Sequence, residues 1–318
     1  MSSSADPDHR PRPGAAAAAD DAPGGEPRGP RAVRGAQGVS RLGAQRIDPD
    51  EPLGPRTVAE DAAALRPRAQ EIVGIPLALT DYDHTMDWMD AVVRERGQAI
   101  VTAAAVHLVM VAREDAATRA AISRPNVLAV PDGQPLVWAQ KALGHRDASR
   151  VYGPDLMAKY LERATRTGTR HYLYGGRNQG ALVQLVNELR RRYPGLQIVG
   201  GYSPPFRPLT EDEAAFVVED ANRSQADVVW VGTGQPKQEL WMAAMRDRLD
   251  APILAGVGAA FDFHAGLVPQ APAWMQASGL EWAYRLVHEP RRLWRRYARY
   301  NPLFVGAFAR QLYEHRRA

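Results

Sequence analysis

Hydrophobic and polar positions alternate with two periods along the middle of the chain, from about residue 71 to residue 257. Short runs of Val, Ile, Leu and Tyr, bounded by Gly, Pro or Asp, indicate strands. These strands are predicted at residues 72–79, 99–104, 126–130, 170–174, 197–201, 227–231 and 253–257. Stretches with apolar residues every three or four positions indicate amphipathic helices. These helices are predicted at residues 83–96, 105–122, 133–143, 153–167, 179–193, 210–224 and 237–249.

The alternation of strands and helices predicts an α/β fold with a mainly parallel, doubly wound sheet and helices on both of its faces. Thr210, followed by Glu213, is typical of a capping box and marks the start of one of these helices. No internal repeat is evident along the chain.

Three segments of different composition divide the chain. Residues 1–68 are predicted to be a disordered tail, because Pro, Gly, Ala, Arg and Asp dominate up to about Arg56 and few large apolar side chains are available for a core. Residues 69–278 are predicted to hold the α/β core. In residues 279–318, aromatic side chains such as Trp282 and Trp294 alternate with arginines. This last segment is predicted to be a basic, aromatic helical appendage.

Composition restricts the classes of site. The chain has no cysteine, which excludes disulfides, thiolate metal sites and cysteine nucleophiles and fits a reducing compartment. Its formal net charge of +4 is too small to predict nucleic-acid binding. Positive charge gathers after Leu286, where eight arginines stand against two glutamates. No apolar run reaches the roughly 18 residues of a membrane span and no secretory signal pattern is present, so we expect a cytoplasmic protein.

The sequence VPDGQPLVWAQKALG, residues 130–144, places Asp132 and Gly133 between a predicted strand and a predicted helix. In open parallel sheets, ligands bind where strands end and helices begin, because unpaired N–H groups of the helices face the crevice there. Asp is also among the best residues for capping those N–H groups. The spacing therefore fits both a helix cap and a functional carboxylate at the crevice.

Three other loops carry polar groups after predicted strands and are expected to converge on the same edge of the sheet. Thr102 and His107 follow one strand. In YGGRNQG, residues 174–180, glycines would let backbone N–H groups approach a phosphate. In VGTGQPKQE, residues 231–239, Pro236 suits a first helical turn that also holds a cation, an amide and an acid. We expect ligand-binding roles for Gly133, Gly175, Gly232, Gln235, Lys237, Gln238 and Glu239.

Two patterns that resemble metal or acid–base sites have simpler explanations. Asp81 and Asp83 form a D-x-D pattern of the kind that binds metal–nucleotide complexes, but they directly precede a predicted helix and fit capping equally well. His107 and His264 have the intrinsic pKa of general bases, yet neither has a metal-ligand partner at helical spacing. No metal site is predicted.

The fingerprints of several nucleotide enzymes are missing. A dinucleotide site needs G-x-G-x-x-G after the first strand, whereas the Gly-rich sequence GVGAAFDFHAG comes near the end of the predicted sheet. The chain also has no Walker A motif and no G-x-S-x-G turn. These absences disfavour NAD-linked oxidation, P-loop hydrolysis and serine hydrolysis, and no cofactor is predicted.

Seven stretches between residues 72 and 304 resemble, in order, the WecG/TagA/CpsF family of bacterial glycosyltransferases. They are PDGQPLVW, RVYGPDL, YLYGG, YPGLQIVGGYSPPF, VGTGQPKQELW, GVGAAFDFHAG and GLEWAYRLVHEPRRLWRRYARYNPLF. The resemblance implies a Rossmann-like core with a helical appendage. It implies an inverting enzyme that moves a hexose-type sugar from a UDP-sugar to a polyprenyl-diphosphate-linked sugar acceptor. Such enzymes work at the cytoplasmic membrane face in surface polysaccharide synthesis.

The resemblance also implies roles for individual residues. Asp132 corresponds to the family's proposed catalytic base, Thr102 to the Thr of its T-x-N segment, and Arg150 to an active-site arginine ahead of G-x-D-L. The appendage arginines that are thought to close over the nucleotide correspond to the cluster 291–299, which includes Arg292 and Arg295.

Two residues depart from the family's motifs. Ala104 stands where T-x-N has its Asn, and Pro131 stands before Asp132 where the family has Ala. We therefore expect the donor sugar to be held differently, and the sequence leaves the donor sugar, the acceptor sugar and the linkage open.

Both the function and the appendage have a second interpretation. The alternative function is a catalytically inactive subunit that binds a nucleotide sugar and regulates or assembles a polysaccharide machine. The appendage is either an amphipathic helix docked on the core or a segment that contacts the anionic membrane surface, where arginines and interfacial aromatics favour binding. The membrane interpretation predicts peripheral association with the cytoplasmic membrane, and no nucleic-acid partner is expected.

Overall fold

The computed structural model describes residues 61–317, apart from the side chains of Ala273, Ala277 and Arg292. The predicted tail covers residues 1–68, and its residues 1–60 lie outside the described residues. Within its last eight residues, Ala62–Leu65 form a short helix, α1, which begins after the cap residue Asp61.

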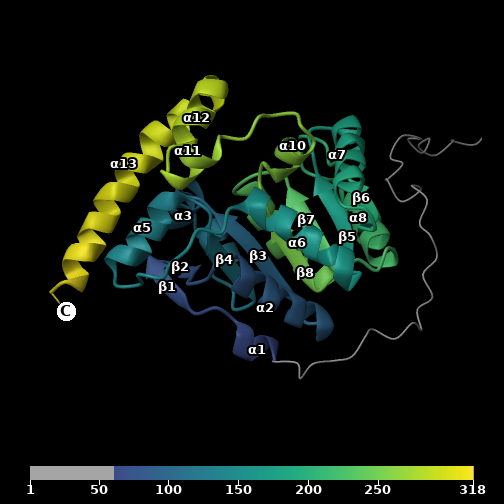
Figure 1. Ribbon diagram of the computed structural model, residues 1–318, viewed down its shortest axis with the longest axis horizontal. Helices are drawn as coiled ribbons and strands as arrows, with labels where there is room; N and C mark the ends of the chain where they lie inside the picture. The colour runs from purple at the N-terminus through teal and green to yellow at the C-terminus, as the bar shows by residue number, and fades with distance from the viewer. Residues whose placement is uncertain (1–60, 318) are drawn as a thin grey trace, which may run out of the picture. The chain divides into compact units, whose positions relative to one another are not determined.

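A six-stranded sheet forms the centre of the described part of the chain (Figure 1). Its strands are β3 (Ala99–Ala104), β4 (Val127–Pro131), β5 (Arg170–Gly175), β6 (Gln197–Tyr202), β7 (Val228–Gly232) and β8 (Ile253–Gly256). The strand order is β4-β3-β8-β7-β5-β6, and every neighbouring pair is parallel. Helices pack on both faces, so the predicted α/β fold with a mainly parallel sheet is confirmed.

Most of the helices lie between the strands, as predicted. They are α2 (Tyr82–Arg94), α3 (Val106–Glu114), α4 (Ala116–Ile122), α5 (Gln134–Ala142), α6 (Gly153–Thr167), α7 (Gln179–Arg192), α8 (Glu211–Arg223), α9 (Lys237–Met245) and α10 (Ala260–His264). The predicted capping box of α8 is confirmed. The Thr210 hydroxyl accepts from the Glu213 N–H at 3.2 Å, and the Glu213 carboxylate accepts from the Thr210 N–H at 2.9 Å.

The single helix predicted over residues 105–122 is wrong, because Asp115 interrupts it. The backbone of Asp115 is extended, and its carboxylate accepts from the Thr118 N–H at 2.7 Å. Asp115 therefore ends α3 and caps α4, as short polar side chains do at helix starts.

The single strand predicted over residues 72–79 is also wrong. It contains the turn of an antiparallel hairpin, β1 (Ala69–Ile72) paired with β2 (Ile75–Ala78). Val73 and Gly74 turn the chain with φ angles of 55° and 78°, in the left-handed region that glycine adopts readily. The residues around this turn are apolar, so the hydrophobic pattern alone does not reveal it.

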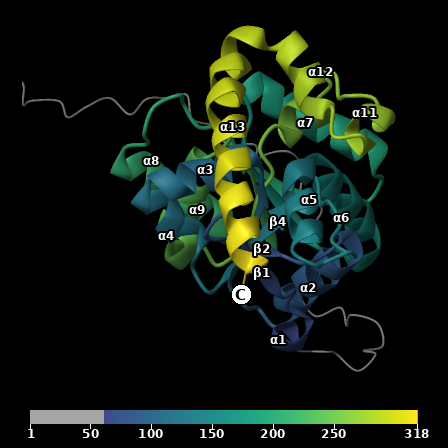
Figure 2. The same ribbon diagram turned by 90° about the vertical axis from the view of Figure 1, so that its left-hand side faces the viewer.

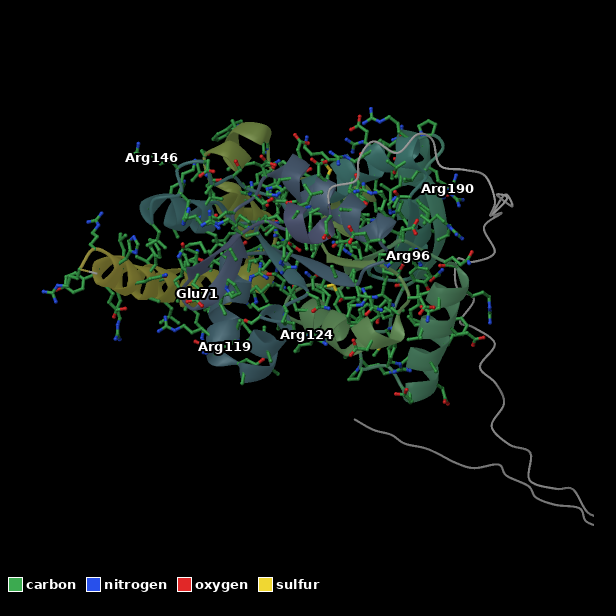
Figure 3. The ribbon with its side chains drawn as sticks, turned by 90° about the horizontal axis from the view of Figure 1, so that it is seen from below. Glu71, Arg96, Arg119, Arg124, Arg146 and Arg190 are labelled. Atoms are coloured by element: carbon green, nitrogen blue, oxygen red, sulfur yellow. The ribbon has the colours of Figure 1, made fainter. Side chains whose placement is uncertain are left out.

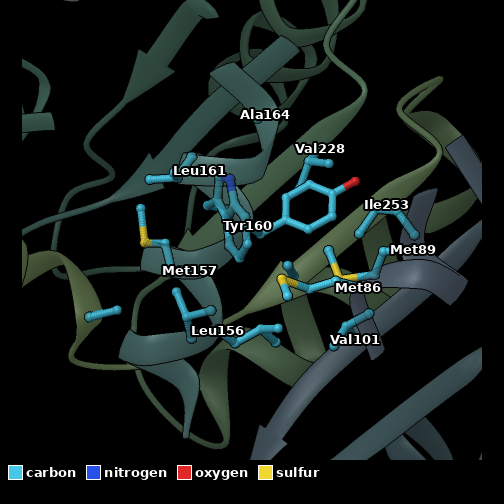
Figure 4. Close-up of a cluster of buried hydrophobic side chains, with 14 of the residues drawn as sticks. Met86, Met89, Val101, Leu156, Met157, Tyr160, Leu161, Ala164, Val228 and Ile253 are labelled. Atoms are coloured by element: carbon cyan, nitrogen blue, oxygen red, sulfur yellow. The ribbon is translucent and has the colours of Figure 1, made fainter. Parts of the chain in front are cut away.

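Of the three hydrophobic clusters among the described residues, two pack helices on opposite faces of the sheet. The larger includes side chains from α2, α6 and three strands, shown in Figure 4 as Met86, Met89, Val101, Leu156, Met157, Tyr160, Leu161, Ala164, Val228 and Ile253. A second cluster packs Val217 of α8 and Met242 of α9 against the opposite face. Because both faces are closely packed, the ends of the strands are held in fixed positions.

Arginines hold the amino ends of the strands. Arg246 is fully buried in the 3₁₀ helix Arg246–Arg248 and donates to the carbonyls of Ala99 and Leu249 at 3.3 and 2.5 Å. On the surface, Arg96, which is labelled in Figure 3, pairs with Asp227 at 2.9 Å. The carboxyl ends of the strands are left for the cleft described below.

Three helices, α11 (Ala273–Ala277), α12 (Glu281–His288) and α13 (Pro290–His315), end the chain. In Figure 2, α13 lies across α3 and ends beside the β1–β2 hairpin. The Tyr300 ring stacks on His107 with ring centroids 5.1 Å apart, and the Gln311 amide bonds the backbones of Val73 and Glu71 at 2.8 Å each. Among the helices of residues 61–317, none is long and apolar enough to cross a membrane.

Candidate active site

A cleft of about 1270 Å³ lies at the carboxyl ends of the strands. Loops that follow β3, β4, β5, β7 and β8 line it, together with residues of α12 and α13. Six predicted site residues line this cleft: Asp132, Gly133, Arg150, Gly232, Gln235 and Lys237. The expected convergence of loops from separate strands at one edge of the sheet is therefore present.

Asp132 follows the last residue of β4 and is held by backbone groups. Its N–H donates to the Ala104 carbonyl at 2.9 Å, and its Oδ1 accepts from the N–H of Gly153, the first residue of α6, at 2.7 Å. The N-cap residue of α5 is Gly133, so the Asp132 carboxylate does not cap the helix that follows it. Within the described residues, Asp132 Oδ2 has no hydrogen-bond partner.

Glycine at position 153 allows its N–H to reach the Asp132 carboxylate. A Cβ on Gly153 would lie 3.0 Å from the Ala103 Cβ and 3.1 Å from the Val257 carbonyl oxygen. Because only glycine fits there, the amino end of α6 rests on the strand ends and its first N–H reaches the carboxylate of Asp132.

The surroundings of Asp132 favour its protonated form more than water does. The pKa of Asp132 is raised to about 6, and burial is the largest cause; Arg150 opposes the shift, while the charge of Glu281 contributes to it. A carboxyl group with a pKa near neutrality suits proton transfer at physiological pH, because both of its protonation states are accessible.

Arg150 braces the loop that carries Asp132. Its Nε donates to the Asp132 carbonyl at 2.5 Å, and its Nη2 pairs with Glu281 Oε2 at 2.5 Å. Its guanidinium lies over the Tyr152 ring at 4.3 Å from the centroid. The guanidinium is thus committed to protein partners in this structure.

A buried polar network lies beneath the floor of the cleft. Thr102 Oγ1 donates to Glu239 Oε1 at 2.7 Å, and Gln238 Nε2 donates to the same oxygen at 2.8 Å. Gln238 Oε1 accepts from the Gly258 N–H at 3.1 Å. Burial raises the pKa of Glu239 to about 6. Thr102, Gln238 and Glu239 are therefore below the cleft and support the loops that line it.

Gly175 and Gly232, two glycines with expected ligand-binding roles, serve close packing. A Cβ on Gly175 would lie 2.8 Å from the backbone of Gly232, and a Cβ on Gly232 would lie 2.7 Å from the Phe261 ring. Beside them, Gln235 Nε2 donates to the Ala103 carbonyl at 2.5 Å, and Lys237 lies on the cleft wall. Gly175 itself does not line the cleft.

The appendage contributes residues to the cleft. Arg296 belongs to the arginine cluster 291–299 that was expected near the nucleotide, and Trp282 is one of the aromatic residues noted in the appendage. No site role was predicted for five further cleft residues, Glu281, Arg285, Tyr297, Tyr300 and Asn301. The spacing of Glu281 and Arg285, four residues apart, was the available signal, because it places both on one face of a helix. Arg295 is exposed, with its guanidinium 5.5 Å from the Trp294 ring centroid, and the side chain of Arg292 lies outside the described residues.

The remaining candidates have local partners. Asp81 caps α2 by accepting from the His84 N–H at 2.8 Å, as the capping interpretation predicted. His264 Nε2 bonds the Pro154 carbonyl oxygen at 2.9 Å. Across residues 61–317, no three His, Asp or Glu side chains gather as a metal site would require. Ala104 is fully buried in an apolar cluster.

The sequence of the chain matches those of known proteins. The profile of the family described as "Glycosyl transferase WecG/TagA/CpsF family" matches residues 70–318. A protein of Bacillus spizizenii, named N-acetylglucosaminyldiphosphoundecaprenol N-acetyl-beta-D-mannosaminyltransferase, is 32% identical over 170 residues, which cover 52% of this chain and 62% of that protein. A protein of the same name from Bacillus subtilis is 31% identical over 167 residues, with the same coverage. The chain thus spans about six-tenths of the length of these relatives. It belongs to the WecG/TagA/CpsF family of glycosyl transferases.

Proposed function

We propose that this protein is an inverting glycosyltransferase. It would move a hexose-type sugar from a UDP-sugar to a polyprenyl-diphosphate-linked sugar, in the synthesis of a surface polysaccharide. The observation that carries the proposal is the carboxylate of Asp132, which lines a large cleft with one oxygen bonded to the Gly153 N–H and the other left for a substrate. Family membership and the names of the two relatives support the reaction class and the class of acceptor.

The proposed reaction is a single displacement at the anomeric carbon. Asp132 Oδ2 takes the proton from the acceptor hydroxyl, and the acceptor oxygen forms a bond to C1 of the donor sugar. The bond from C1 to the diphosphate oxygen breaks, and UDP leaves with the electron pair from the opposite face. General-base assistance of this kind contributes typically about 10²–10⁴-fold to the rate.

The departing diphosphate needs positive charge close to it. Lys237, Arg285 and Arg296 line the same cleft as Asp132 and can supply that charge, because cations stabilise an anionic leaving group in a site that excludes water. Arg150 is committed to Asp132 and Glu281, so we assign it to positioning. We propose that no metal or other cofactor is needed.

We propose peripheral contact with the cytoplasmic membrane surface as the way to reach a lipid-linked acceptor. Three tryptophans near the end of the chain, Trp274 of α11 and Trp282 and Trp294 of the appendage, are 65%, 43% and 52% exposed. Arg291 and Arg295 are exposed beside the last of them. Tryptophan at the lipid interface and arginine near anionic head groups both favour such contact.

The test is to incubate the protein with a panel of UDP-sugars and lipid-diphosphate sugars, with and without EDTA, and to weigh the products. We expect one acceptor to gain the mass of one sugar, with EDTA having no effect. Release of UDP without a glycosylated lipid would overturn the proposed acceptor. Tight binding of a UDP-sugar with no transfer to any acceptor would favour a regulatory or assembly subunit instead.

A further inference from the structure

Two charged side chains, Glu281 and Arg150, join the appendage to the loop that carries Asp132. Glu281, the first residue of α12, contacts Arg150 Nη2 through its Oε2 at 2.5 Å. Arg150 Nε in turn donates to the Asp132 carbonyl oxygen at 2.5 Å. The side chains of Arg150 and Glu281 are only 16% and 11% exposed. The two residues are 131 positions apart in the sequence.

The side chain of Arg150 is held by several contacts at once. Its Nε and Nη2 are bonded as described, its Nη1 lies 3.5 Å from the Gln276 carbonyl, and its guanidinium covers the Tyr152 ring. A poorly solvated ion pair of this kind is costly to break from one side, because the remaining charge is left buried and unpaired. Glu281 fixes the orientation of Arg150 and, together with Asp132, balances its charge.

We infer that Glu281 is a positioning residue for the proposed base: through Arg150, it holds the Asp132 loop in place and ties that placement to the docking of α12. This inference rests on the proposed role of Asp132 as the base. The appendage then helps to position the proposed base, in addition to supplying cations to the cleft.

The charges around Asp132 determine in which direction its pKa moves when Glu281 is changed. Burial is the largest cause of the raised pKa of Asp132. The charged and titratable groups that interact with this carboxyl are Arg150, Glu281 and Arg285, together with the phenols of Tyr82 and Tyr152. Glu281 disfavours the carboxylate form and the two arginines favour it. Removing the charge of Glu281 therefore lowers the pKa of Asp132.

Two substitutions separate charge from contact. Glu281→Gln keeps an oxygen that accepts from Arg150 but removes the negative charge, whereas Glu281→Ala removes both. A matched control is Glu114→Gln, which removes a surface ion pair between α3 and Arg299 of α13 at 2.9 Å. The control weakens a contact between core and appendage that does not touch Asp132.

The first measurement is the pH profile of kcat. The wild-type rate should rise with pH through about 6, because the base acts as the carboxylate. In Glu281→Gln this limb should move to lower pH by roughly 0.5–1 unit. Glu281→Ala should lose about tenfold or more in kcat with a smaller change in KM, as expected when a positioned base is disordered. Glu114→Gln should match the wild type.

The second measurement does not need turnover. The ¹³C signal of the Asp132 carboxyl carbon, assigned by its loss in Asp132→Asn, is titrated in the wild type and in Glu281→Gln. A lower midpoint in Glu281→Gln supports the inference even if no variant transfers sugar, in which case only the proposed function fails. Equal midpoints, or an unmoved rate profile in an active enzyme, overturn the inference and leave the proposed function standing.

Discussion

Asp132 is the side chain on which the proposed chemistry depends. Asp132→Asn keeps the size of the side chain and an oxygen that accepts from the Gly153 N–H, but it cannot take a proton. We expect turnover to fall by about 10²–10⁴-fold, while UDP binding and the midpoint of thermal unfolding stay close to the wild type. Mass spectrometry of the products and calorimetry with UDP check this. Near-normal turnover would remove Asp132 from the role of base.

The raised pKa of Glu239 predicts that the stability of the protein depends on pH. Its pKa is about 6 in the folded protein, above its ordinary value of 4.5, so the folded state binds this proton more tightly than the unfolded chain. The free energy of unfolding should therefore decrease as pH rises from 4.5 through 6, by roughly 2 kcal/mol. Glu239→Gln keeps the acceptor for Thr102 and should show a smaller decrease.

Urea unfolding of both proteins between pH 4 and about pH 7 checks this dependence. Thr102→Val is the companion variant, because it removes the donor to Glu239 but leaves the acid in place. If Glu239→Gln and the wild type lose stability in parallel across this range, the carboxyl group of Glu239 is not the source of the dependence.

At the scale of elements, the turn between α11 and α12 sets the position of Glu281. Gly279 has a φ of 73°, and a Cβ there would lie 3.0 Å from Cη2 of Trp138 on α5. We expect Gly279→Ala to lower transfer activity and to speed hydrogen exchange in α12, since it combines about 1–2 kcal/mol of backbone strain with a clash.

The matched control for this prediction is Gly266→Ala. Gly266 has a similar φ of 70°, but a Cβ there would meet nothing within 4 Å. It therefore carries the backbone strain without the clash. Equal hydrogen exchange in α12 for the two variants would show that contact with Trp138 does not position the turn.

The hydrophobic pattern predicted elements well where their ends coincide with strong local signals. The helix predicted at residues 153–167 has those bounds, because Pro154 lies in its first turn and Gly168 ends it in the left-handed region. The pattern failed at Asp115, whose capping role depends on a local backbone turn that an apolar period does not reveal. Within a helix, the same aspartate would look like an ordinary exposed residue.

At the scale of the whole molecule, the place of the site followed from the fold. Parallel strands bring their carboxyl ends to one edge, which is why Asp132, Gln235 and Lys237 line one cleft. The sequence did not reveal that Thr102 bonds Glu239, 137 residues away, or that Glu281 reaches Arg150. Such pairings depend on how distant segments pack, and no local pattern encodes them.

Membrane contact is also a property of the whole molecule. In flotation with vesicles that contain anionic lipid, we expect Arg295→Glu to weaken binding by roughly fivefold or more, because each basic residue near the surface contributes about 1 kcal/mol. Arg166→Glu is the control, since Arg166 is exposed on α6, outside the appendage. Equal losses in the two variants would point to net charge alone, and no loss in either would argue against this surface.

The two anchors of α13 constrain its length. Tyr300 stacks beside the cleft and Gln311 bonds the hairpin. The two residues are eleven positions apart, which is about three helical turns, so both anchors fall on one side of the helix. A single residue inserted between them would rotate one anchor by about 100° relative to the other. Natural length variation in this segment should therefore come in whole numbers of turns, and a one-residue insertion should be as harmful as losing an anchor.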